Sequence, residues 1–172
     1  MSKNSTTYLS LGSNLNDKLQ YLKDAVQSID ETIGKVCAIS SVYQTPSWGF
    51  DGNDFYNICI EVSTKFSAEE LLDKLLVLET KLGRKRNNTT GYENRTIDID
   101  IILYENRIID SEKLKLPHPK ALERKFVLLP LEEINSDIVF PKPILHISQG
   151  IQNCKDSSTI VKTNIEIKVK NN

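Results

Sequence analysis

The sequence predicts an α+β fold of ferredoxin-like type, in which helices pack on one face of a largely antiparallel sheet. Strand-like and helix-like segments follow one another in the order strand, helix, strand, strand, helix, strand. The 172 residues fit one domain, and 39% hydrophobic with 26% charged residues is the balance of a protein with a buried core. We therefore expect a single domain over residues 1–172, which could include a C-terminal extension at residues 154–172.

The first half of this order is a strand, a helix and two strands. Residues 7–11 alternate and run into a Gly-Ser-Asn turn, as a strand does at its end. A helix should follow and end at Gly34, because apolar residues recur at three- and four-residue steps, at Leu19, Leu22, Val26, Ile29 and Ile33. Residues 36–44 and 56–62 then have the composition of two antiparallel strands joined by a loop at residues 45–53.

The second half adds a helix, a loop and a strand. A capping box begins at Ser67, and an apolar face continues from it to Gly83, so a helix is predicted there. Residues 84–95 lack apolar periodicity and contain turn formers, which favours a mobile loop. Strong alternation over residues 96–104 predicts a strand.

The C-terminal third has weaker signals. Helical turns are expected over residues 119–124 and 127–133. Apolar and charged residues alternate over residues 165–170, which predicts either an extra edge strand or an ordered arm.

Composition argues against several classes of protein. The 22 basic and 23 acidic residues give a net charge of -1, so nothing global indicates a nucleic-acid or membrane partner. No apolar signal peptide or membrane-spanning run is found, so we expect a cytoplasmic protein, most simply a monomer. The cysteines lack metal-type spacing and are odd in number, which indicates reduced thiols at Cys37, Cys59 and Cys154.

The strongest chemical signal is the pair Asp98 and Asp100 on the last predicted strand. Alternate side chains of a strand share a face, so the two carboxylates should point the same way, about 7 Å apart, while the isoleucines between them face the other side. Two such charges are costly without a partner, and a hard cation such as magnesium is a suitable one. The alternative is a strand with a solvated acidic face, because Asp-x-Asp alone is a weak motif.

Arginines are concentrated just before these aspartates. Only five of the 22 basic residues are arginines, and Arg84, Arg86 and Arg95 are three of them. Guanidinium groups bind phosphate oxygens bidentately and stay charged, so the clustering indicates phosphate recognition, although a solvated helix end would also explain residues 83–86. The sequence has neither a Walker glycine loop nor a kinase glycine-rich loop, so ATP chemistry would need a site of another design.

Aromatic residues provide candidates for holding a flat heterocycle. Trp48, Phe55 and Phe126 could do so, and Asn57 can present both a donor and an acceptor. Each aromatic residue alone is more often a core residue, except that Trp48 lies in a loop rich in glycine and proline. His118, between two prolines, could orient a nucleotide or cap a turn.

Taken together, these motifs make the chain resemble the 6-hydroxymethyl-7,8-dihydropterin pyrophosphokinase family. The matching blocks follow the family order over residues 9–15, 40–46, 55–57, 79–86, 95–100, 116–119 and 124–128. The resemblance implies that ATP and a pterin bind side by side, that the pterin hydroxymethyl oxygen attacks the β-phosphorus, and that AMP leaves. It implies a step of folate biosynthesis with ATP as co-substrate and two Mg²⁺ ions.

The resemblance also implies roles for single residues. Asp98 and Asp100 would hold the metals, Arg84 and Arg95 would stabilise the transferring group, and Glu79 would tie substrate-binding elements together. The nucleotide would be contacted by Arg86, Tyr92, Lys113, Lys115, His118 and Arg124. The pterin pocket would be lined by Thr45, Pro46, Trp48, Phe55, Asn57 and Phe126.

Two other classes were weighed. A nucleotidyltransferase would also combine a Gly-Ser pair with Asp-x-Asp, but the pair lies close before the aspartates in that signature and far from them here. A ferredoxin-like RNA-binding module fits the predicted fold but lacks aromatic strand motifs and a basic sheet face, and it leaves the two aspartates unexplained.

Overall fold

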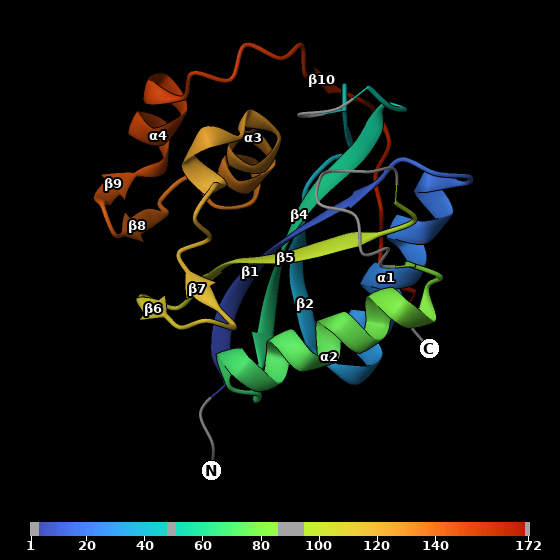
Figure 1. The fold of residues 1–172 in the computed structure, drawn as a ribbon, viewed down its shortest axis with the longest axis horizontal. Coiled ribbons are helices and arrows are strands. Elements are labelled where there is room, and N and C mark those ends of the chain that lie inside the picture. The colour runs from blue at the N-terminus through green and yellow to red at the C-terminus, as the bar shows by residue number, and fades with distance from the viewer. Residues whose placement is uncertain (1–3, 48–50, 86–94, 171–172) are drawn as a thin grey trace.

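A computed structural model of the chain describes residues 4–47, 51–85 and 95–170 (Figure 1). Its centre is an antiparallel sheet in the order β10-β3-β4-β1-β5, in which β2 also pairs with β4. The strands are β1 (Ser5–Ser13), β2 (Gly34–Ile39), β3 (Tyr43–Thr45), β4 (Phe55–Thr64), β5 (Asp98–Tyr104) and β10 (Val161–Lys162). The predicted α+β, ferredoxin-like architecture is confirmed.

Helices α1 (Lys18–Thr32) and α2 (Ala68–Lys81) cover one face of this sheet and form the main core with it. Leu9, Ile58 and Ile60 point from the strands to this face and are fully buried. The capping box predicted for α2 is present: Ser67 accepts from the amide of Glu70, whose side chain accepts from the amide of Ser67. The predicted stripe of leucines forms the buried side of the helix.

Helix α3 (Lys125–Ile134) lies on the opposite face, so the expectation that all helices share one face is wrong. Strand alternation explains this: Cys59 stands between two residues of the main core and points the other way, into a second core cluster that includes Val127 and Leu128. The same side carries α4 (Ile147–Asn153), the short helix η1 (Ala121–Glu123) and the small hairpin of β8 (Val139–Pro141) with β9 (Ile144–His146). A second small hairpin, β6 (Ile109–Asp110) with β7 (Lys115–Leu116), packs Leu116 into the main core instead.

The segment predicted as one strand over residues 36–44 forms two strands, β2 and β3. The strand is interrupted at Ser40, which hydrogen-bonds both backbone groups of Cys59 on β4. Its amide donates to Cys59 O at 2.9 Å, and its side-chain hydroxyl, in place of a backbone carbonyl, accepts from Cys59 N at 3.0 Å. Both strands follow the same edge of β4, with β3 at the end that begins with Phe55. Strand β1, in contrast, continues through the predicted turn to Ser13.

Helix α1 ends at Thr32 with Ile33 as its C-cap, so it ends directly before Gly34, as predicted. Gly34 is also the first residue of β2, where its missing side chain allows close contact with β4. A Cβ atom at this position would lie 2.5 Å from Ser63 O and 2.9 Å from Thr64 Cβ. We expect Gly34→Ala to lower the free energy of unfolding by about 2 kcal/mol, because the backbone of a paired strand cannot move away cheaply. Urea unfolding measures this. Gly150→Ala is the control, because the Cβ would meet the ends of leucine side chains and no backbone atom, with Leu122 Cδ2 nearest at 3.1 Å. Equal stability of the two variants would contradict the argument.

The C-terminal segment crosses the molecule from α4 and ends near α1 (Figure 1). It pairs with β3 as β10, and further on the amide of Val42 donates to Ile165 O at 3.1 Å. Ile167 is only 5% exposed and belongs to the main core. Of the two predicted forms of residues 165–170, the ordered arm is present, and the edge strand lies earlier, at residues 161–162.

The three cysteines are unpaired with one another: Cys37 is exposed, Cys59 is buried and Cys154 is partly buried. Within the ranges that the structure describes, no helix combines the length and apolar character that crossing a bilayer requires.

Candidate active site

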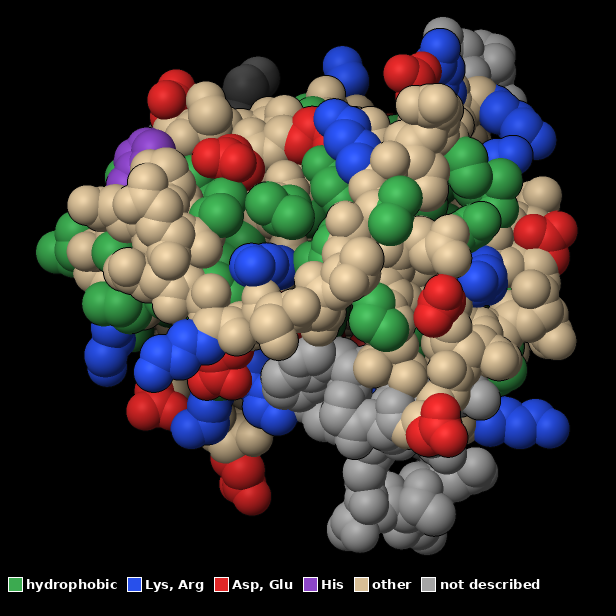
Figure 2. Space-filling model, turned by 90° about the horizontal axis from the view of Figure 1, so that it is seen from above, with side chains coloured by type: hydrophobic (Ala, Val, Ile, Leu, Met, Phe, Trp, Pro, Cys, Tyr) green, Lys and Arg blue, Asp and Glu red, His purple; other side chains and the backbone are tan. Residues whose placement is uncertain are grey.

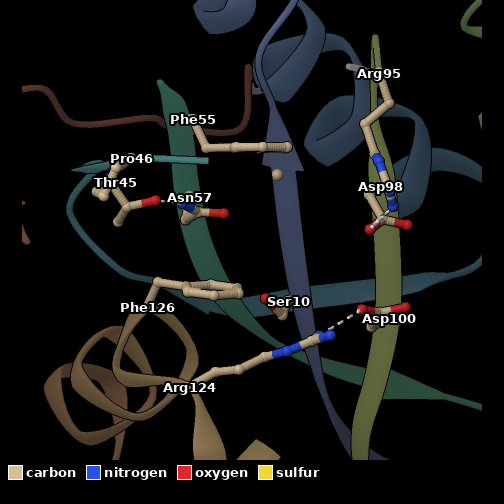
Figure 3. A pocket seen from close by; sticks show the side chains of 11 residues that line it. Ser10, Thr45, Pro46, Phe55, Asn57, Arg95, Asp98, Asp100, Arg124 and Phe126 are labelled. Atoms are coloured by element: carbon tan, nitrogen blue, oxygen red, sulfur yellow. Dashed lines mark hydrogen bonds and ion pairs between the residues drawn. The ribbon is translucent and has the colours of Figure 1, made fainter. Parts of the chain in front are cut away.

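A pocket opens on the sheet face that α3 covers only in part (Figure 3). Strands β1, β3, β4 and β5 and the start of α3 all contribute to it. Its lining residues are Ser10, Gly12, Thr45, Pro46, Phe55, Asn57, Arg95, Asp98, Asp100, Arg124 and Phe126. All of them except Ser10 and Gly12 are candidates from the sequence, and they come from segments far apart in the chain.

Asp98 and Asp100 project from one face of β5 into this pocket (Figure 3). The isoleucines on either side of them, Ile97, Ile99 and Ile101, are at most 4% exposed and pack into the main core. The strand geometry expected from the sequence is therefore present: one face packs and the other presents two carboxylates.

Asp98 is held between two arginines. Arg84 Nη1 lies 2.6 Å from its Oδ1, and Arg95 Nη1 lies 2.7 Å from its Oδ2. Burial opposes ionisation of this carboxyl group, but the two guanidinium groups outweigh burial and lower its pKa below the ordinary value. Asp98 is therefore a fixed negative charge at neutral pH.

Asp100 lies in a different electrostatic setting. Among the described residues, the arginine beside it is Arg124, whose Nη1 is 3.8 Å from Oδ2, beyond hydrogen-bond distance. Burial and the charge of Asp98 raise the pKa of Asp100 to about 7. His118 Nε2 lies 3.7 Å from the same oxygen, but burial and the charge of Arg124 lower the pKa of His118 to about 4, so the imidazole is neutral. The described groups around Asp100 therefore leave its ionised form disfavoured, and a bound cation would favour that form.

The donor atoms suit magnesium better than a metal held by the protein alone. No group of three or more His, Cys, Asp or Glu side chains among the described residues could hold a metal ion. Magnesium typically takes one or two carboxylates from the protein and completes its shell with water and substrate phosphate oxygens. Asp98 and Asp100, open to the pocket at 26% and 34% side-chain exposure, meet this requirement.

Glu79, on α2, hydrogen-bonds β5, the strand that carries Asp98 and Asp100. Its side chain is 2% exposed, and its Oε1 accepts from the amide of Ile99 at 2.7 Å and from Arg84 Nη1 at 2.6 Å. Glu79 therefore joins α2, β5 and the arginine that contacts Asp98.

The other half of the pocket is an aromatic slot with a polar base. The rings of Phe55 and Phe126 project toward the pocket from β4 and α3, with Asn57 between them (Figure 3). Asn57 Nδ2 donates to Thr45 Oγ1 at 2.8 Å, which orients the amide of this buried residue. A flat heterocycle with donors and acceptors at its edge would fit such a slot.

Sequence reasoning missed Gly12 and Ser10, which lie on β1 between the slot and the aspartates. A Cβ at Gly12 would lie 2.8 Å from Asn57 Oδ1, so only glycine leaves room for the observed position of that amide. A glycine inside an alternating strand is a signal of such a close approach, and it could have been used.

Two of the described candidates lie away from this pocket, and three candidates lie in segments that the structure does not describe. Trp48, Arg86 and Tyr92 lie outside the described residues. Lys113 forms an ion pair with Asp73 at 2.6 Å, and Lys115 forms one with Asp110 at 2.8 Å; neither lysine lines the pocket.

Two adjacent carboxylates, several guanidinium groups and an aromatic slot are the features expected of a transferase that moves a phosphate-containing group. Comparison with known proteins is more specific. The sequence profile of the 7,8-dihydro-6-hydroxymethylpterin-pyrophosphokinase (HPPK) family matches residues 8–136. The chain belongs to this family, and it is an ATP-dependent diphosphotransferase of folate biosynthesis.

Individual relatives agree. The chain is 37% identical over 137 residues to a 2-amino-4-hydroxy-6-hydroxymethyldihydropteridine pyrophosphokinase of Aquifex aeolicus, covering 79% of this chain and 84% of that protein. The enzyme of the same name from Methylorubrum extorquens is 42% identical over 134 residues, covering 77% of this chain and 84% of the relative. The folic acid synthesis protein fol1 of Pneumocystis carinii is 38% identical over 154 residues, which is 89% of this chain.

Solved structures share the fold. An HPPK-DHPS determined in complex with substrates superimposes with a TM-score of 0.72 at 13% identity, over 87% of this chain. The wild-type Plasmodium falciparum HPPK-DHPS gives a TM-score of 0.70 at 15% identity over 88% of this chain. The chain spans only 43% and 45% of these two structures and 20% of fol1, so it corresponds to one part of those longer proteins.

Proposed function

We propose that this pocket is where pyrophosphate passes from ATP to the hydroxymethyl group of 6-hydroxymethyl-7,8-dihydropterin, giving AMP and the pterin diphosphate. The observation that carries the proposal is the adjacency of the aromatic slot and the two aspartates within one pocket. A pterin in the slot would place its hydroxymethyl arm next to Asp98 and Asp100, where a triphosphate held through metal ions would lie. Holding two substrates in this geometry makes the transfer effectively unimolecular.

The pterin ring would stack between Phe55 and Phe126. Asn57 would hydrogen-bond its edge, because Thr45 takes up one side of the amide and leaves the other directed toward the pocket. Thr45 and Pro46 would close the slot on the side of β3. Trp48 follows shortly after Pro46 in the sequence, so we keep it as a candidate for the same wall.

Asp98 and Asp100 would hold two Mg²⁺ ions. When bound, these ions neutralise the triphosphate and polarise the attacking hydroxyl group. Asp98 offers a carboxylate that its arginines keep ionised, and Asp100 offers one whose raised pKa a cation would lower. Phosphoryl transfer needs positioning and charge neutralisation more than a strong protein base.

Arg84 and Arg95 would turn from Asp98 to the transferring group, where negative charge spreads in the transition state. Arg124 and the neutral His118 lie at the other end of the acidic pair and would contact the nucleotide or its phosphates. Arg86, Tyr92, Lys113 and Lys115 complete the nucleotide contacts proposed from the sequence, and the structure provides no geometry for them in the pocket.

A cytoplasmic monomer without nucleic-acid or membrane partners is part of the proposal. The net charge of -1 supports it, as does the mixed distribution of charge on the molecule. Seen from above, acidic and basic side chains are interspersed with apolar ones over the visible face (Figure 2). We also propose that residues 1–172 form one domain, with the segment after residue 153 packed back onto it.

The test is a coupled assay with ATP, Mg²⁺ and 6-hydroxymethyl-7,8-dihydropterin, scored for AMP. We expect AMP to form only when the pterin and Mg²⁺ are both present, with the pterin diphosphate in equal amount. ADP in place of AMP would indicate transfer of a single phosphoryl group. A binding module would release neither nucleotide, and either result would overturn the proposed reaction.

A further inference from the structure

Strand β3 is short, and it carries a residue that lines the proposed pterin site. Its last residue, Thr45, begins the pterin side of the pocket, yet the strand has only three residues and pairs with β4 through Tyr43, Gln44 and Thr45 alone. On its other side β3 pairs with β10 through Tyr43 and Gln44, and Thr45 lies outside that pairing. Strands this short contribute few ladder hydrogen bonds, so the end of β3 would fray readily if these alone held it. The fixed position of Thr45 therefore needs other contacts.

One carboxylate of α3 provides them. Glu133 Oε1 accepts from the amide of Ser41 at 2.9 Å and from its hydroxyl group at 2.7 Å. Glu133 Oε2 accepts from the phenol of Tyr43 at 2.6 Å and lies 3.4 Å from Lys162 Nζ on β10. We call these four residues the Glu133 clamp.

The chemistry of the clamp indicates a stable arrangement. Burial and the carboxylate raise the pKa of Tyr43, so its phenol remains a proton donor at neutral pH. Burial opposes ionisation of Glu133, but the bonds from Tyr43 and Ser41 outweigh it and lower its pKa, so the acceptor remains charged. Hydrogen bonds to a charged acceptor are roughly twice as strong as neutral ones. The side chain is 24% exposed, so solvent only partly weakens them.

The clamp joins β3 to α3, the elements that carry Thr45 and Phe126 at the aromatic slot. Helix α3 carries Phe126 in its first turn and Glu133 in its last turn, and β3 carries Thr45 two residues after Tyr43. A shift of β3 relative to α3 would change the gap between Thr45 and Phe126 and would loosen the Asn57–Thr45 hydrogen bond. The Lys162 contact adds the C-terminal segment to the same joint.

We propose that Glu133 is a positioning residue of the pterin subsite, which clamps the strand carrying Thr45 to the helix carrying Phe126. The inference rests on the proposed function, since it takes the slot to be the pterin site. It assigns Glu133 no contact with either substrate. The nucleotide side of the pocket lies at Asp98 and Arg124. It does not depend on β3, so nucleotide binding should be unaffected.

The test compares Glu133→Ala with Glu132→Ala, which removes the same charge from the neighbouring position of α3. Calorimetry with 6-hydroxymethylpterin and, separately, with a magnesium complex of a non-hydrolysable ATP analogue measures the two affinities. For Glu133→Ala we expect pterin affinity to fall on the order of tenfold, the ATP-analogue affinity to stay within about twofold, and kcat at saturating pterin to change little. Glu133→Gln should recover part of the loss, because its amide oxygen can still accept from Ser41.

Hydrogen exchange of the segment 41–45 in the ligand-free protein gives an independent measurement. It should be faster in Glu133→Ala and in the milder Tyr43→Phe, which keeps the ring and is expected to fold, than in Glu132→Ala. Pterin affinity that matches the Glu132→Ala control, or an equal loss of both affinities, would overturn the proposal. Failure of the unmodified chain to bind the pterin would overturn the proposed function. In that case, faster exchange in the clamp variants would still show that Glu133 holds β3.

Discussion

Asp100→Ala is expected to lower turnover by about three orders of magnitude. Asp98 and Asp100 are the two carboxylates in the lining of the pocket, so the substitution removes half of the protein ligands proposed for magnesium. Lost metal catalysis costs several kcal/mol, and about 4 kcal/mol corresponds to about a thousandfold in rate. The measurement is kcat from AMP release at increasing concentrations of Mg²⁺.

The same position should respond in the opposite direction when stability is measured without metal. Burial and Asp98 raise the pKa of Asp100 from 3.8 to about 7, so the folded protein binds the proton more tightly than the unfolded chain does. The stability that this proton gives is present below pH of about 4 and is lost as pH rises through about 7. A neutral residue avoids that loss. At pH 8 without Mg²⁺, Asp100→Asn should therefore melt at or above the temperature of the unmodified protein.

These two measurements together separate a metal ligand from a structural residue. Asp137→Ala is the control, because Asp137 is exposed and lies outside the pocket lining, so its loss should affect turnover little. Asp100→Asn should be intermediate and should improve at higher Mg²⁺, since an amide oxygen is a weak ligand. Near-normal turnover of Asp100→Ala at saturating Mg²⁺ would contradict the role of the aspartate pair.

The elements that the sequence predicted well are those set by local patterns. Helix α2 has its capping box at Ser67 and its leucine stripe within one continuous segment, so neighbouring residues suffice to define it. The division into β2 and β3 could not be predicted in this way. It depends on Ser40 pairing with Cys59 and on Ser41 pairing with Glu133, which stands 92 positions further along the chain. The alternation of residues 36–44 does not indicate either contact.

The candidate site likewise has one feature that local sequence predicts and one that depends on the tertiary structure. The shared face of Asp98 and Asp100 follows from the period of a strand, and the structure has it. Which cation contacts which carboxylate depends on tertiary distances. Asp98 pairs with Arg84 and Arg95, whereas the described arginine beside Asp100 is Arg124, at 3.8 Å. The different pKa directions of the two aspartates therefore required the fold.

Arg84→Ala is expected to lower kcat by about a hundredfold to a thousandfold, with a smaller effect on KM. We propose that this guanidinium group meets charge that develops on the transferring group, and removing one such preorganised donor typically costs this much. The chain places Arg84 directly after α2, where Gly83 takes a φ of 85° and the amide of Arg84 donates back to Glu79 O at 3.0 Å. Steady-state kinetics in both substrates measures the effect.

Stability has to be separated from catalysis in this variant, because Arg84 also pairs with the buried Glu79 at 2.6 Å. Removing one partner of a buried ion pair costs about 3 kcal/mol, so Arg84→Ala should melt earlier and must be assayed well below its melting temperature. The double variant Arg84→Ala with Glu79→Gln removes the unpaired charge, while the amide oxygen can still accept from Ile99. We expect it to recover stability but not kcat. Recovery of turnover together with stability would show that Arg84 acts only through the fold, and a loss confined to KM would make it a residue that binds ground state and transition state alike.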